Sequence, residues 1–190
     1  MNKTLLRCIT QPLANVLGQK LSGAIYHDVM PADSILSNPN GTDIISHQLQ
    51  LNFANKASVY ISWADIKGWV QFSLSVSVNS FRSWEQFPAN SANWLECAGK
   101  CFSSYQILGY LDEKIVSTNC DTGEELVEHY YHNPHMLLLH FEEHLVAVTN
   151  CYAEKNFVPQ LSFGDDIWIM FDKGEIQMCT NRLGFELLEA

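Results

Sequence analysis

The amino-acid sequence predicts an α+β protein made of two similar copies, each an N-terminal helix followed by three to five mostly antiparallel strands. Three observations predict this class. A short motif recurs along the chain, apolar and polar residues alternate as in half-buried strands, and helical apolar spacing begins the second half. With 190 residues, 47% of them hydrophobic and 17% charged, the chain can bury a substantial core.

The recurring motif is HQLQLNF at 47–53 and HMLLLHF at 135–141, an offset of 88 residues. Shorter matches follow in the same order: LLRC at 5–8 with WLEC at 94–97, VLG at 16–18 with ILG at 107–109, and VQFSL at 70–74 with VPQLSF at 158–163. Matches in a conserved order indicate an internal duplication. We expect copies at 1–90 and 91–190, related by a pseudo-twofold axis, as separate domains or packed as a single globular unit.

Each copy is predicted to open with a helix. In the second copy, WLECAGKCFSSYQILG at 94–109 places its apolar residues on one helical stripe, with Ser91 or Asn93 as the cap and Gly109 as the stop. In the first copy Pro12 suits a first turn but not a helix interior. We therefore expect a short helix that begins near Thr10, or a kinked one.

Strands follow each helix. They are predicted at KLSGAIYH (20–27) and EKIVSTN (113–119), then in two hairpins, QLQLNF with ASVYISW (48–63) and MLLLHF with LVAVTNCY (136–152). Later strands are predicted at 69–78, 160–163, 166–172 and 175–180, with DKGE at 172–175 as the turn between the last two. This arrangement is mostly antiparallel.

The two hairpins differ in the polarity of one strand face. QLQLNF at 48–53 is apolar on one face and polar on the other, whereas MLLLHF at 136–141 has apolar residues on both. We expect the second strand to be covered on both sides, by a helix, by the other copy or by a partner protein. His140 would lie at the edge of that surface.

Five histidines lie within residues 129–144, which raises the question of a metal site. His129, His132 and His135 are three residues apart, and Pro134 prevents a helix from continuing to His135. The spacing matches no known zinc motif, so we predict no metal and no cofactor. The six cysteines, in a chain without an export signal, predict buried thiols rather than disulfides.

Motifs of enzymes are absent from the sequence. It contains no glycine-rich phosphate loop, no GxSxG and no HExxH. Asp165 and Asp166 could hold magnesium, but glycine and aspartate before an apolar strand are typical of a turn. Cys120 or Cys151 could pair with a histidine, yet no motif supports it. We therefore predict a protein that is not an enzyme.

The acidic residues are concentrated in the second copy. Residues 1–90 hold six Lys and Arg against five Asp and Glu, and residues 91–190 hold five against sixteen, within a total net charge of −10. Such a field attracts basic partners and repels nucleic acid, so the first copy is expected to be mainly a scaffold. The residues predicted to bind the partner are Asp112, Glu113, Asp121, Glu124, Glu125, Glu128, His140, Glu142, Glu143, Asp165 and Asp166.

The order of these segments, an LG turn, a strand, LxLxF, a short turn and a strand such as ISW at 61–63, resembles small β-rich bacterial domains, some of them toxin-immunity proteins. TNCY at 149–152 departs from that pattern. The resemblance implies an acidic protein that neutralises a basic bacterial toxin domain, such as a nuclease, by occluding its active site. Because the N-terminus lacks an export signal and no apolar run reaches about 20 residues, we expect a soluble cytoplasmic protein.

Two other hypotheses remain open. An enzyme or small-molecule-binding protein would use a cleft between the copies, with His140, His144, Asp165 and Asp166 as its polar groups. A homo-oligomer would bury the apolar second face of residues 136–141 against another copy of the chain.

Overall fold

The structure is a computed structural model of the 190-residue chain. The described residues are 3–28, 36–37, 41–65, 72–80, 85–119, 121–150, 152–153, 159–160 and 166–189. Within them lie three helices, α1 (Lys3–Ala14), α2 (Ala92–Cys97) and α3 (Lys173–Leu183). The first-half strands are β1 (Leu21–Asp28), β2 (Leu36–Ser37), β3 (Asp43–Ile45), β4 (Gln48–Phe53), β5 (Ser58–Asp65), β6 (Phe72–Ser77) and β7 (Glu85–Pro88). The later strands are β8 (Phe102–Thr118), β9 (Glu125–Phe141), β10 (His144–Asn150), β11 (Tyr152–Ala153), β12 (Pro159–Gln160), β13 (Ile167–Met170) and β14 (Glu186–Glu189).

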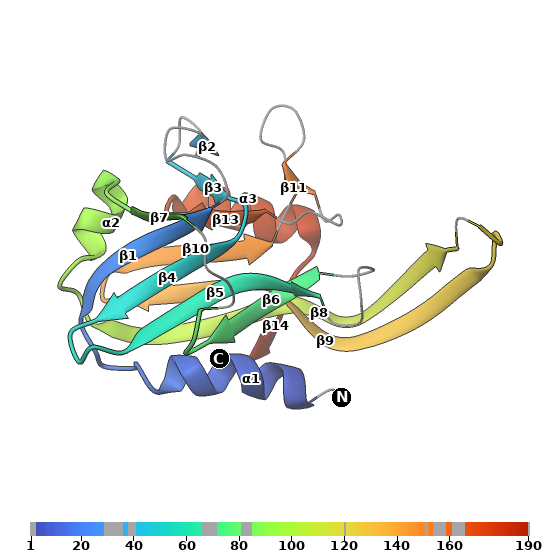
Figure 1. Cartoon of the computed structure of the whole chain (residues 1–190), viewed down its shortest axis with the longest axis horizontal. Coiled ribbons are helices and arrows are strands. Elements are labelled where there is room, and N and C mark those ends of the chain that lie inside the picture. Colours follow the sequence, from blue (N-terminus) through green and yellow to red (C-terminus); the bar gives the residue numbers. More distant parts are fainter. Residues whose placement is uncertain are drawn as a thin grey trace.

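Two antiparallel sheets pack against each other (Figure 1). One has the strand order β6-β5-β4-β1-β7 and the other β14-β8-β9-β10-β13-β3-β2, while β11 and β12 form a separate pair. The predicted mixed α+β class with mostly antiparallel strands is confirmed. The predicted strand at 20–27 is β1, and the predicted hairpins are β4–β5 and β9–β10.

The main core lies between the sheets and draws on both halves of the chain. Alternate residues of the two LxLxF motifs, at 49–53 and 137–141, point into it and are buried. Helix α1 contributes Leu6, Ile9 and Leu13, a helical stripe that packs against the same cluster. The strong period-two signal of these strands therefore reflects one shared interior.

Helix α3 covers the second face of β9. Met136 is fully buried beside Ile176 and Cys179 of α3, and the hydroxyl of Thr180 lies 3.6 Å from the Met136 sulfur. The prediction that this strand is covered on both sides is thus confirmed, with a helix as the cover. Met136 on that face belongs to the interior, while Leu138 and His140 are half-buried.

The predicted helix at 94–109 is wrong beyond its first turn. Helix α2 ends at Cys97, and Gly99 adopts a positive φ of 82°. The Gly99 N–H then donates to Leu21 of β1, and Phe102 begins β8. The stretch from Phe102 onward is rich in β-forming residues, and its buried positions fit a strand as well as a helix.

The predicted strand at 175–180 and the turn at 172–175 are also wrong, because both belong to the start of α3. Asp172 caps this helix by accepting a hydrogen bond from the Glu175 N–H at 2.9 Å. Gly184 ends it in the left-handed conformation, with φ at 66°. Ile176 and Cys179 are three residues apart, a spacing that suits a helix face.

Helix α1 begins at Lys3 rather than near Thr10, and Pro12 lies in its last turn. Pro12 cannot donate to the Cys8 carbonyl, so one helical bond is lost, but α1 ends two residues later and little helix lies beyond the disturbance. The apolar stripe of α1 in the main core outweighs that loss. None of the described helices has the length and apolarity needed to cross a membrane.

Two methionines test the position of α3 directly. Met136→Ala should lower the free energy of unfolding by about 2–5 kcal/mol, because its side chain is fully buried under the helix. Met178→Ala, the matched control, should change it by less than about 0.5 kcal/mol, because Met178 is 53% exposed on the same helix. Urea unfolding measures both, and equal losses would contradict the packing described.

Candidate functional site

Strands β8 and β9 form a hairpin that reaches well beyond the sandwich (Figure 1). They pair from Phe102 opposite Phe141 to Thr118 opposite Glu125. Strand β14 accompanies β8 only as far as Gly109, and β10 accompanies β9 only between Met136 and Phe141. Residues 110–133 therefore form a two-stranded ribbon, here called the acidic arm, which no other described strand flanks. At about 3.3 Å per residue it extends about 30 Å.

A buried polar cluster holds the base of the acidic arm. The Glu113 carboxylate accepts a hydrogen bond from the Asn133 amide at 2.7 Å and lies 3.1 Å from Nε2 of His135. Nδ1 of the same histidine lies 3.2 Å from the Asn150 side-chain oxygen. We call Glu113, Asn133, His135 and Asn150 the base cluster. It joins both arm strands to β10 of the sandwich.

The surroundings of the base cluster favour the ionised form of its carboxyl. Burial would raise the pKa of Glu113, but the hydrogen bond and charge of His135, together with the Asn133 bond, hold it below its ordinary value. The His135 ring stacks on Phe185, with centroids 5.7 Å apart, and meets the edge of Tyr110. The histidine is thus fixed in position on all sides.

Glycine at position 109 permits the close strand approach at this point. A Cβ there would lie only 1.9 Å from the Asn133 carbonyl oxygen, which is backbone and cannot move aside. The pairing register also shifts between Leu108 and Gly109. The predicted role of Gly109 as the end of a helix is therefore wrong, because Gly109 lies inside β8.

The tip of the acidic arm is closed by its own hydrogen bonds. The Asn119 side-chain oxygen accepts from the N–H groups of Asp121 and Thr122, at 2.8 and 3.2 Å. Gly123 has a positive φ of 72° and donates to the Asn119 carbonyl. Asp121 and Glu124, two of the predicted binding residues, are exposed in this turn.

One face of the acidic arm is exposed from the pair of Asp112 and Tyr131 to the pair of Thr118 and Glu125. Val116 and Val127 pair across the strands, 46% and 45% exposed, and Tyr131, opposite Asp112, is 50% exposed. Charged and polar residues flank this apolar pair on the same face. An apolar centre with a polar rim is the composition of protein interfaces.

The arm also carries half of the net charge of the chain. Six carboxylates against one lysine, Lys114, give it a net charge of −5, out of −10 for all 190 residues. The six are the predicted residues Asp112, Glu113, Asp121, Glu124, Glu125 and Glu128. Asp112, Asp121, Glu124 and Glu125 are exposed, Glu128 pairs with Ile115 in the strand ladder, and Glu113 belongs to the base cluster.

The remaining predicted acidic residues lie elsewhere. Glu142 and Glu143 form the β9–β10 turn, at the end of β9 opposite the arm tip. Lys100 binds both, at 3.4 and 2.7 Å, and its hydrogen bond lowers the pKa of Glu143 to about 2. These two carboxylates are therefore partly neutralised and do not extend the acidic arm.

The polar groups of the predicted cleft do not converge. His140 is half-buried opposite Leu145, at one end of β10, whereas Asp166 directly precedes β13, which pairs with the other end at Asn150. Five residues of strand separate these ends, about 17 Å. Asp165 lies outside the described residues.

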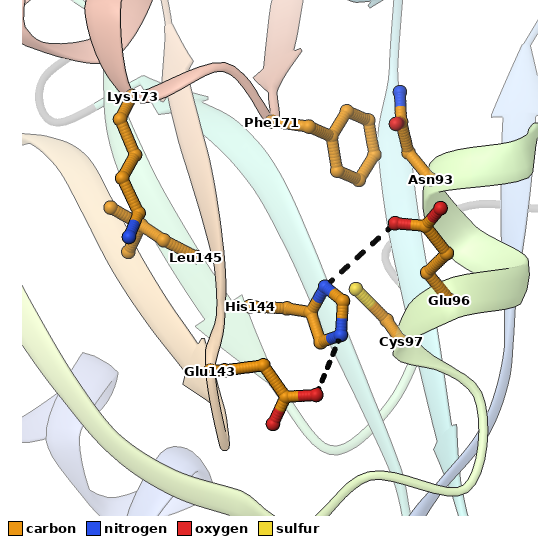
Figure 2. Close-up of a pocket in the computed structure, with 8 residues that line it drawn as sticks. All are labelled: Asn93, Glu96, Cys97, Glu143, His144, Leu145, Phe171 and Lys173. Atoms are coloured by element: carbon orange, nitrogen blue, oxygen red, sulfur yellow. Dashed lines mark ion pairs between the residues drawn. The ribbon is translucent and has the colours of Figure 1, made fainter.

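A pocket of about 150 Å³ does lie between α2 and the start of β10 (Figure 2). Its lining residues are Asn93, Glu96, Cys97, Glu143, His144, Leu145, Phe171 and Lys173, all from the second half of the chain. Among the predicted cleft residues that the structure describes, His140, His144 and Asp166, only His144 lines this pocket. Burial, followed by the nearby glutamates, raises the pKa of Cys97 to about 11, so its thiol is protonated and unsuited to nucleophilic attack.

No family model, curated protein or solved structure matches this chain. The site therefore has to be argued from its own geometry. Within the described residues, no group of three or more His, Cys, Asp and Glu side chains could hold a metal ion. The sequence did not reveal Asn133, His135 and Asn150 as partners of Glu113. The available signal was the polar stretch NPH at 133–135 beside a predicted strand.

Glu113→Gln should lower the free energy of unfolding at pH 7 by about 2 kcal/mol, since it removes a charge that the base cluster stabilises. A carboxyl whose pKa is lowered on folding stabilises the protein above its unfolded pKa, and that stability disappears as pH falls through the folded pKa. The difference between wild type and variant should therefore shrink below about pH 4.

The exposed neighbour Asp112 provides the control. Its pair with His129, 3.5 Å apart, is solvent-exposed on both sides, so Asp112→Asn should cost less than about 1 kcal/mol. Denaturant unfolding between neutral and acid pH measures both variants. A pH-independent loss in Glu113→Gln would contradict a stabilising role for the ionised carboxylate.

Proposed function

We propose that this chain is a non-enzymatic acidic binding protein, an immunity protein that neutralises a basic bacterial toxin domain by occluding its active site. The acidic arm is the docking element. The observation that carries the proposal is a projecting ribbon of net charge −5 with an exposed apolar face. The cytoplasmic location expected from the sequence is part of the same proposal.

The charge and shape of the arm suit an active-site cleft such as that of a nuclease. A protein that holds a nucleic acid binds its phosphates with Lys and Arg, so its cleft is positively charged. A narrow acidic ribbon complements such a cleft, and its carboxylates accelerate the encounter in a salt-sensitive way. Val116, Val127 and Tyr131 then supply apolar contact at the centre of the interface.

The same charge argues against self-association through the arm. Two arms of net charge −5 repel each other, whereas a basic partner gains from the contact. The apolar second face of β9, the other surface considered for a second copy, is partly covered by α3, with Met136 buried and Leu138 half-buried. A different, basic protein is therefore the occupant that the electrostatics favour.

We also infer that the chain arose by duplication of one α+β unit, with copies at 1–90 and 91–190 related by a pseudo-twofold axis. In support, α1 is followed by the adjacent strands β1, β4, β5 and β6, and α2 by β8, β9, β10 and β13, in the same spatial order. Residues 29–47, between β1 and β4, then correspond to the acidic arm, which the outer parts of β8 and β9 form.

Strand register supports the duplication in more detail. Leu21 pairs with Phe53 next to an irregularity in β1, and Phe102 pairs with Phe141 next to an irregularity at the matching place in β8. The LG match does not fit this register, because Gly18 precedes β1 whereas Gly109 lies within β8. The copies are better matched through LxLxF.

Charge reversal at the arm tip tests the proposal. The partner to use is the toxin domain encoded beside this gene, with growth of co-expressing cells and association kinetics as readouts. Glu124→Lys with Glu125→Lys should slow association at least about tenfold and weaken its salt dependence, because steering charge is lost. Protection of growth should fall accordingly.

The control is Glu85→Lys with Glu186→Lys, which changes the net charge equally at exposed sites away from the arm tip. It should leave association within about twofold of wild type. Equal effects of both double variants would assign binding to overall charge and contradict a role for the arm. Gene neighbours unrelated to toxins, with no basic protein bound, would contradict the immunity function.

A further inference from the structure

The pocket between α2 and β10 is built from parts that are fixed in place. Trp94 of α2 packs edge-on against Phe171 with ring centroids 5.2 Å apart, and its indole N–H donates to Tyr26 at 2.6 Å. Lys100 holds Glu143 at 2.7 Å on the opposite wall. The aromatic wall and the β9–β10 turn are therefore positioned before any ligand arrives.

His144 lies in the middle of the pocket, between two carboxylates. Its Nε2 is 3.1 Å from Glu143, and its Nδ1 is 4.0 Å from Glu96 (Figure 2). Glu143 is already bound by Lys100, whereas Glu96 is 66% exposed and contacts the histidine only at the limit of an ion pair. Glu96 thus keeps most of its capacity to accept hydrogen bonds.

Lys173 and Asn93 also line the pocket, and neither side chain has a polar partner among the described residues. Lys173 lies on one side of the pocket and Glu96 on the other, with Phe171 and His144 between them (Figure 2). The pocket therefore offers a free ammonium group and an underused carboxylate, separated by an aromatic ring.

We propose that this pocket binds a small zwitterion, a ligand with an ammonium group and a carboxylate on a short apolar body. Glu96, with the Asn93 side-chain oxygen, accepts from the ligand ammonium, and Lys173 binds its carboxylate. The apolar body packs on Phe171 and Leu145. A volume of about 150 Å³ suits a ligand of amino-acid size and is too small for a nucleotide.

A ligand with one charge fits this pocket less well. A simple cation would be repelled by Lys173, and a simple anion would be repelled by Glu96 and Glu143. The site is independent of the acidic arm and adds a second binding activity to the proposed function. Its test needs no protein partner.

The test measures by calorimetry how tightly the full chain binds each member of a series of ω-amino acids. The series runs from glycine through β-alanine, γ-aminobutyrate and δ-aminovalerate to ε-aminocaproate. One length should bind at least about tenfold more tightly than the shortest or longest member, because the spacing of Lys173 and Glu96 selects it. Butylamine and butyrate, each with one charge, should bind at least about tenfold more weakly than the best zwitterion.

Two variants assign the binding to these residues. Glu96→Gln and Lys173→Met should each weaken the best ligand by about tenfold or more, while Glu186→Gln and Lys20→Met, at exposed sites outside the pocket, should not. Thermal unfolding of the free proteins confirms that each variant is folded. No binding at millimolar ligand, equal binding of butylamine or butyrate, or unchanged binding in both pocket variants would overturn the proposal.

Discussion

The pairing of β8 with β9, from Phe102 to Thr118, is the constraint on which the rest of the structure depends. Within the sandwich, β9 contributes to both core clusters, with Leu137, Leu139 and Phe141 on one face and Met136 on the other, so a slip of one residue would exchange the contents of two cores. The register shifts once between Leu108 and Gly109 and then continues into the acidic arm. The part of the arm beyond Tyr110 is therefore positioned by a core to which it does not itself contribute.

A two-stranded ribbon has little stability of its own in water, so the contacts at its base matter. Glu113 and Asn133 come from opposite strands of the arm, and His135 connects them to Asn150 of β10. The cluster is buried and polar, which restricts its geometry, because each group must keep its partner. This arrangement leaves the outer part of the arm free to present charge and apolar surface to a partner.

Strand period and charge distribution could be read from the sequence because they are local. The LxLxF hairpins, β1 and the concentration of carboxylates in the second half all followed from residue order. The stretch from Phe102 to Gly109 could not, since its apolar residues fit a helical stripe as well as a strand, whereas EKIVSTN at 113–119 was predicted as a strand and its residues 113–118 lie in β8. Helix α3 was not predicted, because Asp172 and Gly174 are typical turn residues. The structure shows that Asp172 instead caps the helix. The base cluster and the pocket join residues far apart in the sequence, and strand register alone brings them together.

On the proposed function, the acidic arm is dispensable for folding and essential for binding, and shortening the arm separates these roles. Residues 114–129 can be replaced by Asn-Gly, a two-residue turn that suits a hairpin, between Glu113 and Tyr130, which pair directly. This change keeps the base cluster intact. The account predicts that the free energy of unfolding changes by less than about 1 kcal/mol and that binding to the basic partner is lost. Binding of the shortened protein with unchanged affinity would contradict it.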